Sequence, residues 1–335
     1  MSQAVAVIPG EGIGPEVIGA AQRVVAASGA AIDWTEVRVG AECAARDGTP
    51  VPETALQQLR ELRVILKGPL VNPVGGGYPS PTGTIRRALD LWVSVRLART
   101  FAGAPTKYPG IDLVLIRDTT EGLHNGVEQQ LGPDAAMGVS YNTRATSARM
   151  AQFAFEYART HGRQRVTLVH LASVKKLTDG LRLQEARRVA EQFADIEFDD
   201  MLTDHACMQL VRAPEAFDVV LSGHAEGGLI ADLCAGLIGS VGLMPGAIYG
   251  DGLAMFEAAH GTAPRRAAQN VANPTASILA AAMLLNYVGE PQAGERVSRA
   301  VLDTIAAGEH VTYDLGGTAS TSEMADDVIA RLRQA

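Results

Sequence analysis

The chain has 335 residues, of which 47% are hydrophobic and 20% are charged, an ordinary composition for a globular protein with room for a large core. Its formal net charge is −8 and its sequence pI is near 5.4, which argues against a nucleic acid or an anionic membrane as a partner. The longest apolar run, near 278–285, is too short to cross a bilayer, which needs about 20 residues, so we expect no membrane segment.

Three cysteines, Cys43, Cys207 and Cys234, show neither a CxxC motif nor the spacing of Cys and His metal ligands. An odd number without such a pattern is typical of reduced thiols. The first eight residues lack a basic region and lead directly into a glycine loop, so they indicate a first strand and not a signal peptide. We therefore expect a cytoplasmic protein.

The first third of the chain alternates short apolar runs with helical patterns. Strands are expected at 4–8, 32–39 and 63–66, and helices at 15–25 and 52–60. This alternation predicts an α/β fold with a largely parallel sheet. The glycine loop at 9–14 precedes a helix start and could cradle a phosphate. Because the GxGxxG spacing is absent, a tight turn is the alternative interpretation.

The remaining two thirds continue the same alternation. Strands are expected at 111–116, 138–144, 166–170 and 218–221, an irregular edge at 196–201, and helices at 147–159, 176–192, from 204, from 227 and at 273–287. Two stretches indicate loops, the polar segment 120–128 and the glycine-rich segment 236–252. No internal repeat interrupts the pattern.

Three arginines stand near the ends of expected elements: Arg86, Arg96 and Arg117. A Pro/Gly-rich loop brings Ser80 and Thr82 to the start of the helix that carries Arg86, where free backbone N–H groups point outward. Each guanidinium fork can hold one carboxylate bidentately. The pattern therefore predicts a receptor for a small polycarboxylate, and the alternative is that these are surface arginines.

Ordered motifs over nearly the whole chain resemble the NAD(P)-dependent decarboxylating β-hydroxyacid dehydrogenases, which include isocitrate and 3-isopropylmalate dehydrogenases. The motifs are Ile8-Pro-Gly-Glu-Gly-Ile-Gly-Pro-Glu16, Lys67-Gly-Pro-Leu, Ala88-Leu-Asp-Leu-Trp-Val-Ser-Val-Arg96, His260-Gly-Thr-Ala-Pro264, Asn273-Pro274-Thr and the closing segment 314–323. The resemblance implies a two-domain α/β fold unlike the Rossmann fold. It also implies a large cofactor-side domain from 1–98 plus 247–335 and a small domain, 99–246, with the dimer interface.

The resemblance implies an isocitrate-like substrate. Arg86, Arg96 and Arg117 would bind its carboxylates, Ser80 would touch the extra carboxylate of a tricarboxylate, and Thr82 stands where isocitrate enzymes often have Asn. Family members are at least dimers in which the neighbouring subunit completes each active site. We therefore expect a homodimer, or a hetero-oligomer with a complete paralogue.

The cofactor side of the site is implied by the same resemblance. The residues expected to border NAD or NADP are Glu257, His260, Gly261, Thr262, Ala263, Pro264, Arg265 and Asn273. NAD-using members commonly have Asp directly after His-Gly-Ser/Thr-Ala-Pro, whereas this chain has Arg265-Arg266. Cations there suit the 2′-phosphate of NADP or an adenine-nucleotide effector. The alternative is that they are solvated surface charges.

The catalytic groups depart from the family pattern. The family holds Mg²⁺ or Mn²⁺ with three Asp, of which Asp204 and Asp232 match and the third is Gly228. Two oxygen ligands can still hold the ion if water and substrate complete the octahedron, but loss of a carboxylate lowers metal affinity. The acid Tyr corresponds to His124, which titrates near neutrality and could replace it. The Lys that assists removal of the hydroxyl proton corresponds to Leu171, which cannot move a proton.

Two hypotheses follow from these departures. The first is a dehydrogenase acting on an isocitrate-like 2-hydroxy acid through altered acid–base groups, with Lys175 one helical turn from Leu171. The second is a non-catalytic regulatory homologue that senses a polycarboxylate or an adenine nucleotide. A non-redox reaction on the same acid, such as a lyase reaction, is a third reading. Pairing with a complete paralogue would leave neither mixed site whole.

Overall fold

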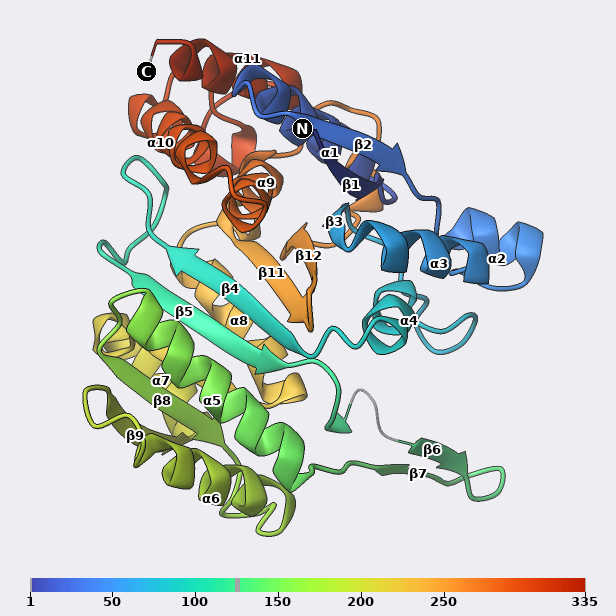
Figure 1. Ribbon diagram of the computed structural model, residues 1–335, viewed down its shortest axis with the longest axis vertical. Helices are drawn as coiled ribbons and strands as arrows, with labels where there is room; N and C mark the ends of the chain where they lie inside the picture. Colours follow the sequence, from blue (N-terminus) through green and yellow to red (C-terminus); the bar gives the residue numbers. More distant parts are fainter. Residues whose placement is uncertain (1, 124–126, 335) are drawn as a thin grey trace. The chain divides into compact units, whose positions relative to one another are not determined.

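The computed structural model describes residues 2–123 and 127–334 (Figure 1). The chain forms two compact units. Unit 1 comprises Met1–Leu91, Arg99–Pro109 and Ile238–Ala335, and unit 2 comprises Trp92–Ala98 and Gly110–Leu237. The expected domain boundaries, after residues 98 and 246, differ from the boundaries of these units. The strand at 93–98 belongs to unit 2, whose sheet it joins, and 99–109 with 238–246 belong to unit 1.

The sheet of unit 1 contains five strands in the order β2, β1, β3, β12 and β11. Their bounds are β1 (Gln3–Ile8), β2 (Ile32–Glu36), β3 (Val64–Lys67), β11 (Pro245–Gly250) and β12 (Leu253–Ala258). All neighbouring pairs are parallel except β11 with β12, which form an antiparallel pair. Branched and aliphatic side chains on these strands are fully buried, among them Ile8, Ile65 and Ile248, and they form the core against α3 and α4.

Seven α-helices surround this sheet: α1 (Gly14–Ala27), α2 (Ala41–Asp47), α3 (Glu53–Leu62), α4 (Pro81–Ala88), α9 (Thr275–Tyr287), α10 (Pro291–Ala307) and α11 (Thr321–Leu332). The helix α9 is apolar on all sides because it packs against α1, α10 and the strands β11 and β12. Its start is capped by Asn273, whose Oδ1 accepts a 2.9 Å hydrogen bond from the Thr275 N–H. A capping box between Ser320 and Glu323 begins α11.

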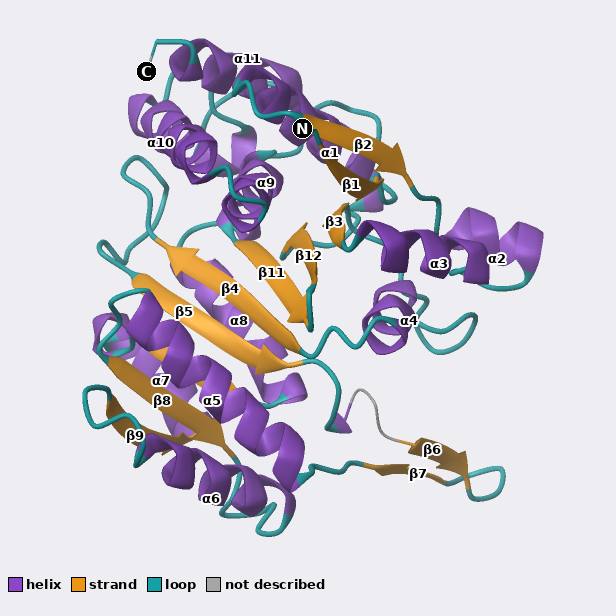
Figure 2. Ribbon diagram, viewed as in Figure 1, coloured by secondary structure: helices purple, strands orange, loops and turns teal. Residues whose placement is uncertain are grey.

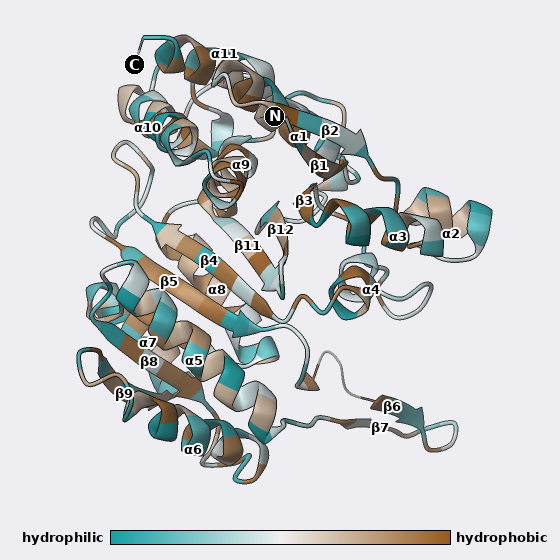
Figure 3. Ribbon diagram, in the orientation of Figure 1, coloured by the Kyte–Doolittle hydropathy of each residue, from teal (hydrophilic) through white to brown (hydrophobic). Residues whose placement is uncertain are grey.

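The sheet of unit 2 contains β4 (Val93–Arg99), β5 (Asp112–Asp118), β10 (Val219–Ser222), β8 (Arg165–His170) and β9 (Glu197–Leu202), in that order. The last four strands are parallel. In Figure 2, α5 (Arg144–Thr160) and α6 (Thr178–Ala190) lie in front of this sheet, and α7 (Thr203–Arg212) and α8 (His224–Leu237) lie behind it. Strands β5 and β8 are mostly hydrophobic in Figure 3, as expected for strands covered on both faces.

A separate two-stranded hairpin extends from unit 2, formed by β6 (Val127–Gln130) and β7 (Ala136–Val139) (Figure 1). All eight of its strand residues are exposed. Short 3₁₀ helices complete the described elements: η2 (Pro214–Ala216), η3 (Val241–Leu243), η4 (Pro264–Arg266) and η5 (Tyr313–Leu315).

The predicted α/β fold with a largely parallel sheet is confirmed, and several elements differ from the sequence-based expectation. The expected strand at 138–144 ends at Val139, and α5 already begins at Arg144. The glycine-rich stretch 236–252, expected to be a loop, contains β11. Its Gly250 is a site of close backbone approach, since an added Cβ would lie 2.5 Å from the Asp90 carbonyl oxygen.

The length and hydrophobicity of the helices bear on the prediction of no membrane segment. Within residues 2–123 and 127–334, none of the helices combines the length and the apolar character that crossing a bilayer requires.

Candidate functional site

The first candidate arginine, Arg86, lies in a buried group of three charged side chains in unit 1. Its Nη2 donates a 2.9 Å hydrogen bond to Oε1 of Glu257, and Lys67 Nζ lies 2.8 Å from Oε2 of the same carboxylate. The three side chains are between 4% and 11% exposed. Two cations share one carboxylate in this group, here called the Arg86 triad.

The Arg86 triad follows from strand pairing. In the parallel ladder between β3 and β12, Lys67 is the partner of Glu257, and both residues end or nearly end apolar runs. Sequence reasoning placed Glu257 beside the cofactor and missed both Lys67 and the contact with Arg86. A signal was present, because a charged residue that continues a buried strand needs a partner of opposite charge.

Ser80 and Thr82 lie on the same helix as Arg86. Ser80 is the N-cap residue of α4, and its hydroxyl accepts a 3.2 Å hydrogen bond from the Gly83 N–H. Pro81 occupies the first helical position, where its missing N–H is not needed. The helix therefore begins before Thr82, which lies in its first turn and not in the preceding loop as expected, and the observed contact of Ser80 is the capping of this helix.

Arg96 and Arg117 lie on the neighbouring strands β4 and β5 of unit 2. Arg96 is 6% exposed. Arg117 is the ladder partner of Ser222 at the end of β10, where the chain turns into α8. Its stem lies against the start of that helix, because a Cβ added to Gly227 would lie 2.7 Å from Arg117 Cγ. Arg117 thus lies near the end of β5, whereas Arg96 lies in the middle of β4 and not near a strand end as expected.

The two predicted metal ligands lie on helices that pack against each other. Asp204 is exposed in the first turn of α7, where its Oδ1 accepts a 2.9 Å hydrogen bond from the His205 N–H, and Asp232 is exposed on α8. In the described part of the chain, no three His, Cys, Asp or Glu side chains come together in a way that could hold a metal ion. A Cβ added to Gly228 would lie 3.1 Å from Arg117 Nη1, so a guanidinium borders the position of the missing carboxylate. This donor set does not fit Mg²⁺ or Mn²⁺.

The segment around Leu171 carries a different basic group, Lys175. The Lys175 N–H bonds to the Leu171 carbonyl at 2.8 Å, so the two residues are one helical turn apart. Lys175 Nζ lies 3.2 Å from Oε1 of Glu226 and 3.1 Å from Oδ1 of Asp179. Both carboxylates are buried, with 10% and 0% of their side chains exposed. His124, predicted to replace the acid Tyr, lies outside the described residues.

The predicted cofactor residues occupy one loop of unit 1 and the start of α9. The loop runs through His260, Gly261, Thr262, Ala263, Pro264 and Arg265, and Glu257 precedes it on β12. It packs on the first glycine loop, because the Ile13 N–H donates a 2.9 Å hydrogen bond to the Thr262 carbonyl. The glycine loop at 9–14 is therefore a close-packed turn against residues 259–266, here called the cofactor-side loop.

The cofactor-side loop ends in two arginines with different surroundings. Arg266 stacks on the ring of Tyr313, with Cζ 3.8 Å from the centroid, and Arg265 is exposed. Asn273 is buried, and its amide Nδ2 donates a 3.0 Å hydrogen bond to Asp314 Oδ2 while Oδ1 caps α9. Its observed contacts therefore join α9 to the segment before α11.

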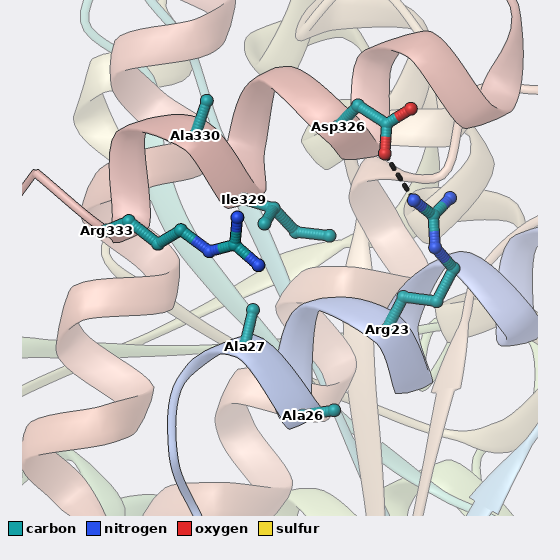
Figure 4. A pocket seen from close by; sticks show the side chains of 7 residues that line it. All are labelled: Arg23, Ala26, Ala27, Asp326, Ile329, Ala330 and Arg333. Atoms are coloured by element: carbon teal, nitrogen blue, oxygen red, sulfur yellow. Dashed lines mark hydrogen bonds and ion pairs between the residues drawn. The ribbon is translucent and has the colours of Figure 1, made fainter.

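A surface pocket of about 580 Å³ lies elsewhere in unit 1, between α1 and α11 (Figure 4). Arg23 and Asp326 form an ion pair at its edge, and Arg333 extends across its mouth over Ala27 and Ile329. None of the predicted site residues lines it. The pocket is thus separate from the candidate site.

The fold defines a class of protein: an α/β protein of two units whose sheets are largely parallel. The family model described as isocitrate/isopropylmalate dehydrogenase matches residues 4–328, and the chain belongs to this family. The family assignment drawn from the sequence motifs is confirmed.

The relatives are consistent with this assignment. Isocitrate dehydrogenase (NAD) catalytic subunit 5, mitochondrial, of Arabidopsis thaliana is 40% identical over 316 residues, which cover 94% of this chain and 84% of the relative. The mitochondrial isocitrate dehydrogenase (NAD) subunit alpha of Homo sapiens is 39% identical over 332 residues, covering 99% and 91%. The crystal structure of isocitrate dehydrogenase from Methylococcus capsulatus superimposes with a TM-score of 0.97 at 43% identity and covers 100% of both chains.

The cytoplasmic localisation expected from the sequence is contradicted by this comparison. The two relatives from Arabidopsis thaliana and Homo sapiens are named as mitochondrial proteins. The cytoplasmic prediction rested partly on the unpaired cysteines. Unpaired cysteines argue only against an oxidising compartment and do not distinguish among reducing compartments.

Proposed function

We propose that this chain binds an isocitrate-like 2-hydroxy polycarboxylate, with Arg86, Arg96 and Arg117 as its carboxylate receptors. The observation that carries the proposal is the Arg86 triad. A buried carboxylate shared by two cations holds the Arg86 guanidinium in place. A fixed guanidinium loses little entropy when it binds a carboxylate, which favours tight and specific recognition.

We further propose that the unaided chain does not carry out the oxidative decarboxylation of its family. Leu171 stands where the family pattern has a basic Lys. An aliphatic side chain neither accepts nor donates a proton. The position of the third metal carboxylate is Gly228, which has no ligand atom. The arginines expected to bind the substrate are thus present, while the basic Lys and one of the three metal carboxylates are missing, as in a regulatory homologue.

A second candidate function, a dehydrogenase with altered acid–base groups, is favoured by one observation. Lys175 brings an amine to within one turn of Leu171, and it lies between Glu226 and Asp179. His124 is the corresponding candidate for the acid. In this reading Lys175 would accept the hydroxyl proton and Glu226 would hold the amine in place.

For the nucleotide we propose NADP or a related adenine nucleotide phosphate, held by the cofactor-side loop. The residues fit such a group, because Arg265 offers an exposed cation and Arg266 is fixed on Tyr313 beside it. The relatives named above are described as NAD enzymes, whereas two adjacent arginines suit the 2′-phosphate of NADP. When bound, the nicotinamide would supply a hydride acceptor.

We propose that the chain assembles as a dimer or as a subunit of a larger oligomer. Large apolar side chains are exposed on two packed helices of unit 2: Met208 and Val211 of α7 are each 45% exposed, and Leu229 of α8 is 69% exposed. Exposed apolar groups on adjacent helices are typical of an interface. The relatives' names, catalytic subunit and subunit alpha, support an assembly.

The test combines binding and turnover on one preparation. Isothermal titration calorimetry with isocitrate, isopropylmalate, homoisocitrate, malate and tartrate would rank the ligands, and we expect isocitrate or a close tricarboxylate to bind most tightly. Absorbance at 340 nm with NAD or NADP, with and without Mn²⁺, would report hydride transfer. Analytical ultracentrifugation of the same sample would give the oligomeric state.

Each result favours one reading. Binding without reduced cofactor supports the non-catalytic proposal. Binding with formation of reduced cofactor supports the second candidate function. A Lys175→Gln variant would then abolish the reduction of the cofactor. If none of the five acids binds, the proposed polycarboxylate function is wrong.

A further inference from the structure

The guanidinium of Arg117 lies beside the start of α8, at the position where the third metal carboxylate of the family pattern is missing. A Cβ added to Gly227 would lie 2.7 Å from Cγ and 2.8 Å from Cδ of Arg117, and a Cβ added to Gly228 would lie 3.1 Å from Arg117 Nη1. The Arg117 stem therefore lies along Gly227, and its guanidinium lies over Gly228. Any side chain at 228 would have to share this space with the guanidinium.

Two further cations lie near this helix start. Lys175 contacts both Glu226, at 3.2 Å, and Asp179, at 3.1 Å. Arg182 is 3.8 Å from the same Asp179, and its guanidinium lies against Gly223, the residue before α8. At residue 228 itself the chain offers a guanidinium and no carboxylate. A guanidinium at this position favours an anion over a divalent cation.

We propose that this chain binds its polycarboxylate without a divalent cation, and that the Arg117 guanidinium over Gly228 supplies the positive charge there. The inference rests on the proposed polycarboxylate function and deepens it. A planar guanidinium fork donates two parallel hydrogen bonds to one carboxylate. The ligand would therefore be the free acid anion, with its carboxylates and hydroxyl not engaged in a metal chelate.

This mode of binding predicts an unusual response to metal. Divalent cations chelate 2-hydroxy polycarboxylates in solution and so lower the concentration of the free anion. A protein that binds the metal complex gains affinity when Mn²⁺ is added, whereas a protein that binds the free anion loses apparent affinity. The sign of the change separates the two modes without any measurement of turnover.

The test is calorimetric titration of isocitrate into the full chain, once with EDTA and once with millimolar Mn²⁺. We expect binding in EDTA and an apparent affinity that is unchanged or weaker in Mn²⁺. Binding that requires Mn²⁺ would overturn this inference and leave the proposed function intact. Binding in neither condition would overturn the proposed function itself, and this inference with it.

Two substitutions at one position sharpen the test. Gly228→Asp places a carboxylate against Arg117, where it competes with the ligand, so we expect affinity in EDTA to fall by about tenfold or more. Gly228→Ala adds the Cβ without the charge and serves as the matched control, with a change of less than about threefold, since the close group is the end of a flexible side chain. An equal loss in both variants would show a steric effect and would contradict the role given to the Arg117 charge. Circular dichroism melting curves would verify that both variants fold.

Discussion

Replacement of Glu257 by Gln is the most informative perturbation of the Arg86 triad. Gln preserves the shape of the side chain and removes its charge, so Lys67 and Arg86 remain buried as two neighbouring cations. At an effective dielectric constant of about 20, each ion pair near 2.8 Å corresponds to about 6 kcal/mol of attraction before desolvation. Removing one partner of a buried pair typically costs about 3–5 kcal/mol. We therefore expect Glu257→Gln to destabilise unit 1 by about that amount.

The assay can follow unit 1 by itself, because the two tryptophans lie in different units: Trp34 on β2 in unit 1 and Trp92 in unit 2. Urea unfolding followed by Trp34 fluorescence in a Trp92→Phe background would report the unit that contains the triad. With an m value of about 2 kcal/mol per M, the urea midpoint should fall by about 1.5–2.5 M.

A second variant makes the result specific to the charge. Lys67→Met combined with Glu257→Gln removes one cation together with the carboxylate, and we expect it to recover about 1 kcal/mol or more of the loss. A midpoint shift below about 0.5 M for Glu257→Gln, or a double variant that is as unstable as the sum of the two single variants, would refute the reasoning.

Three further predictions concern other parts of the chain. Gly12 has φ +62°, and a Cβ added to it would clash with the cofactor-side loop. Gly12→Ala should therefore lower the free energy of unfolding in urea by about 2 kcal/mol or more. An unchanged urea midpoint would be the contrary result. Burial raises the pKa of the Cys234 thiol to about 12, so this residue should react with a thiol reagent at pH 8 only after unfolding, as mass spectrometry of the labelled protein would detect. Burial alone would raise the pKa of Asp200, but hydrogen bonds from Arg187 and His170 outweigh it and lower the pKa. The stabilisation is present above the ordinary Asp pKa and is lost as pH falls through the lower folded value, so Asp200→Asn should lower the melting temperature near neutral pH and lose its effect in acid, whereas a pH-independent difference would contradict this.

Much of the fold was predictable because local patterns agree with the final structure. The apolar run at 4–8, the proline at the start of α1 and the long apolar helix α9 each have a local physical signal. The strand β11 was not predicted, since glycines hide a strand whose backbone must approach a neighbouring segment closely. That approach is set by tertiary packing and leaves no periodic signal.

The candidate site was predictable in part. The positions of Arg86 and Arg117 near the ends of elements could be predicted from the sequence. The position of Arg96 in the middle of β4 and the surroundings of all three arginines could not. Glu257 reaches Arg86 because β3 and β12, nearly 190 residues apart in the chain, are neighbours in the sheet. The approach of Arg117 to Gly228 likewise depends on where β5 and α8 meet. Contacts between distant segments of this kind become visible only in three dimensions.

The most direct measurement of the central claim is the affinity of isocitrate for the wild-type chain and for Arg117→Gln. The matched control is Arg299→Gln, which removes the same charge from an exposed position on α10. Loss of a charged partner for a bound carboxylate costs about 2 kcal/mol or more, so we expect calorimetry to show an affinity at least ~30-fold weaker for Arg117→Gln and unchanged for Arg299→Gln. Equal affinities of the wild type and Arg117→Gln, or no binding by the wild type, would contradict the account.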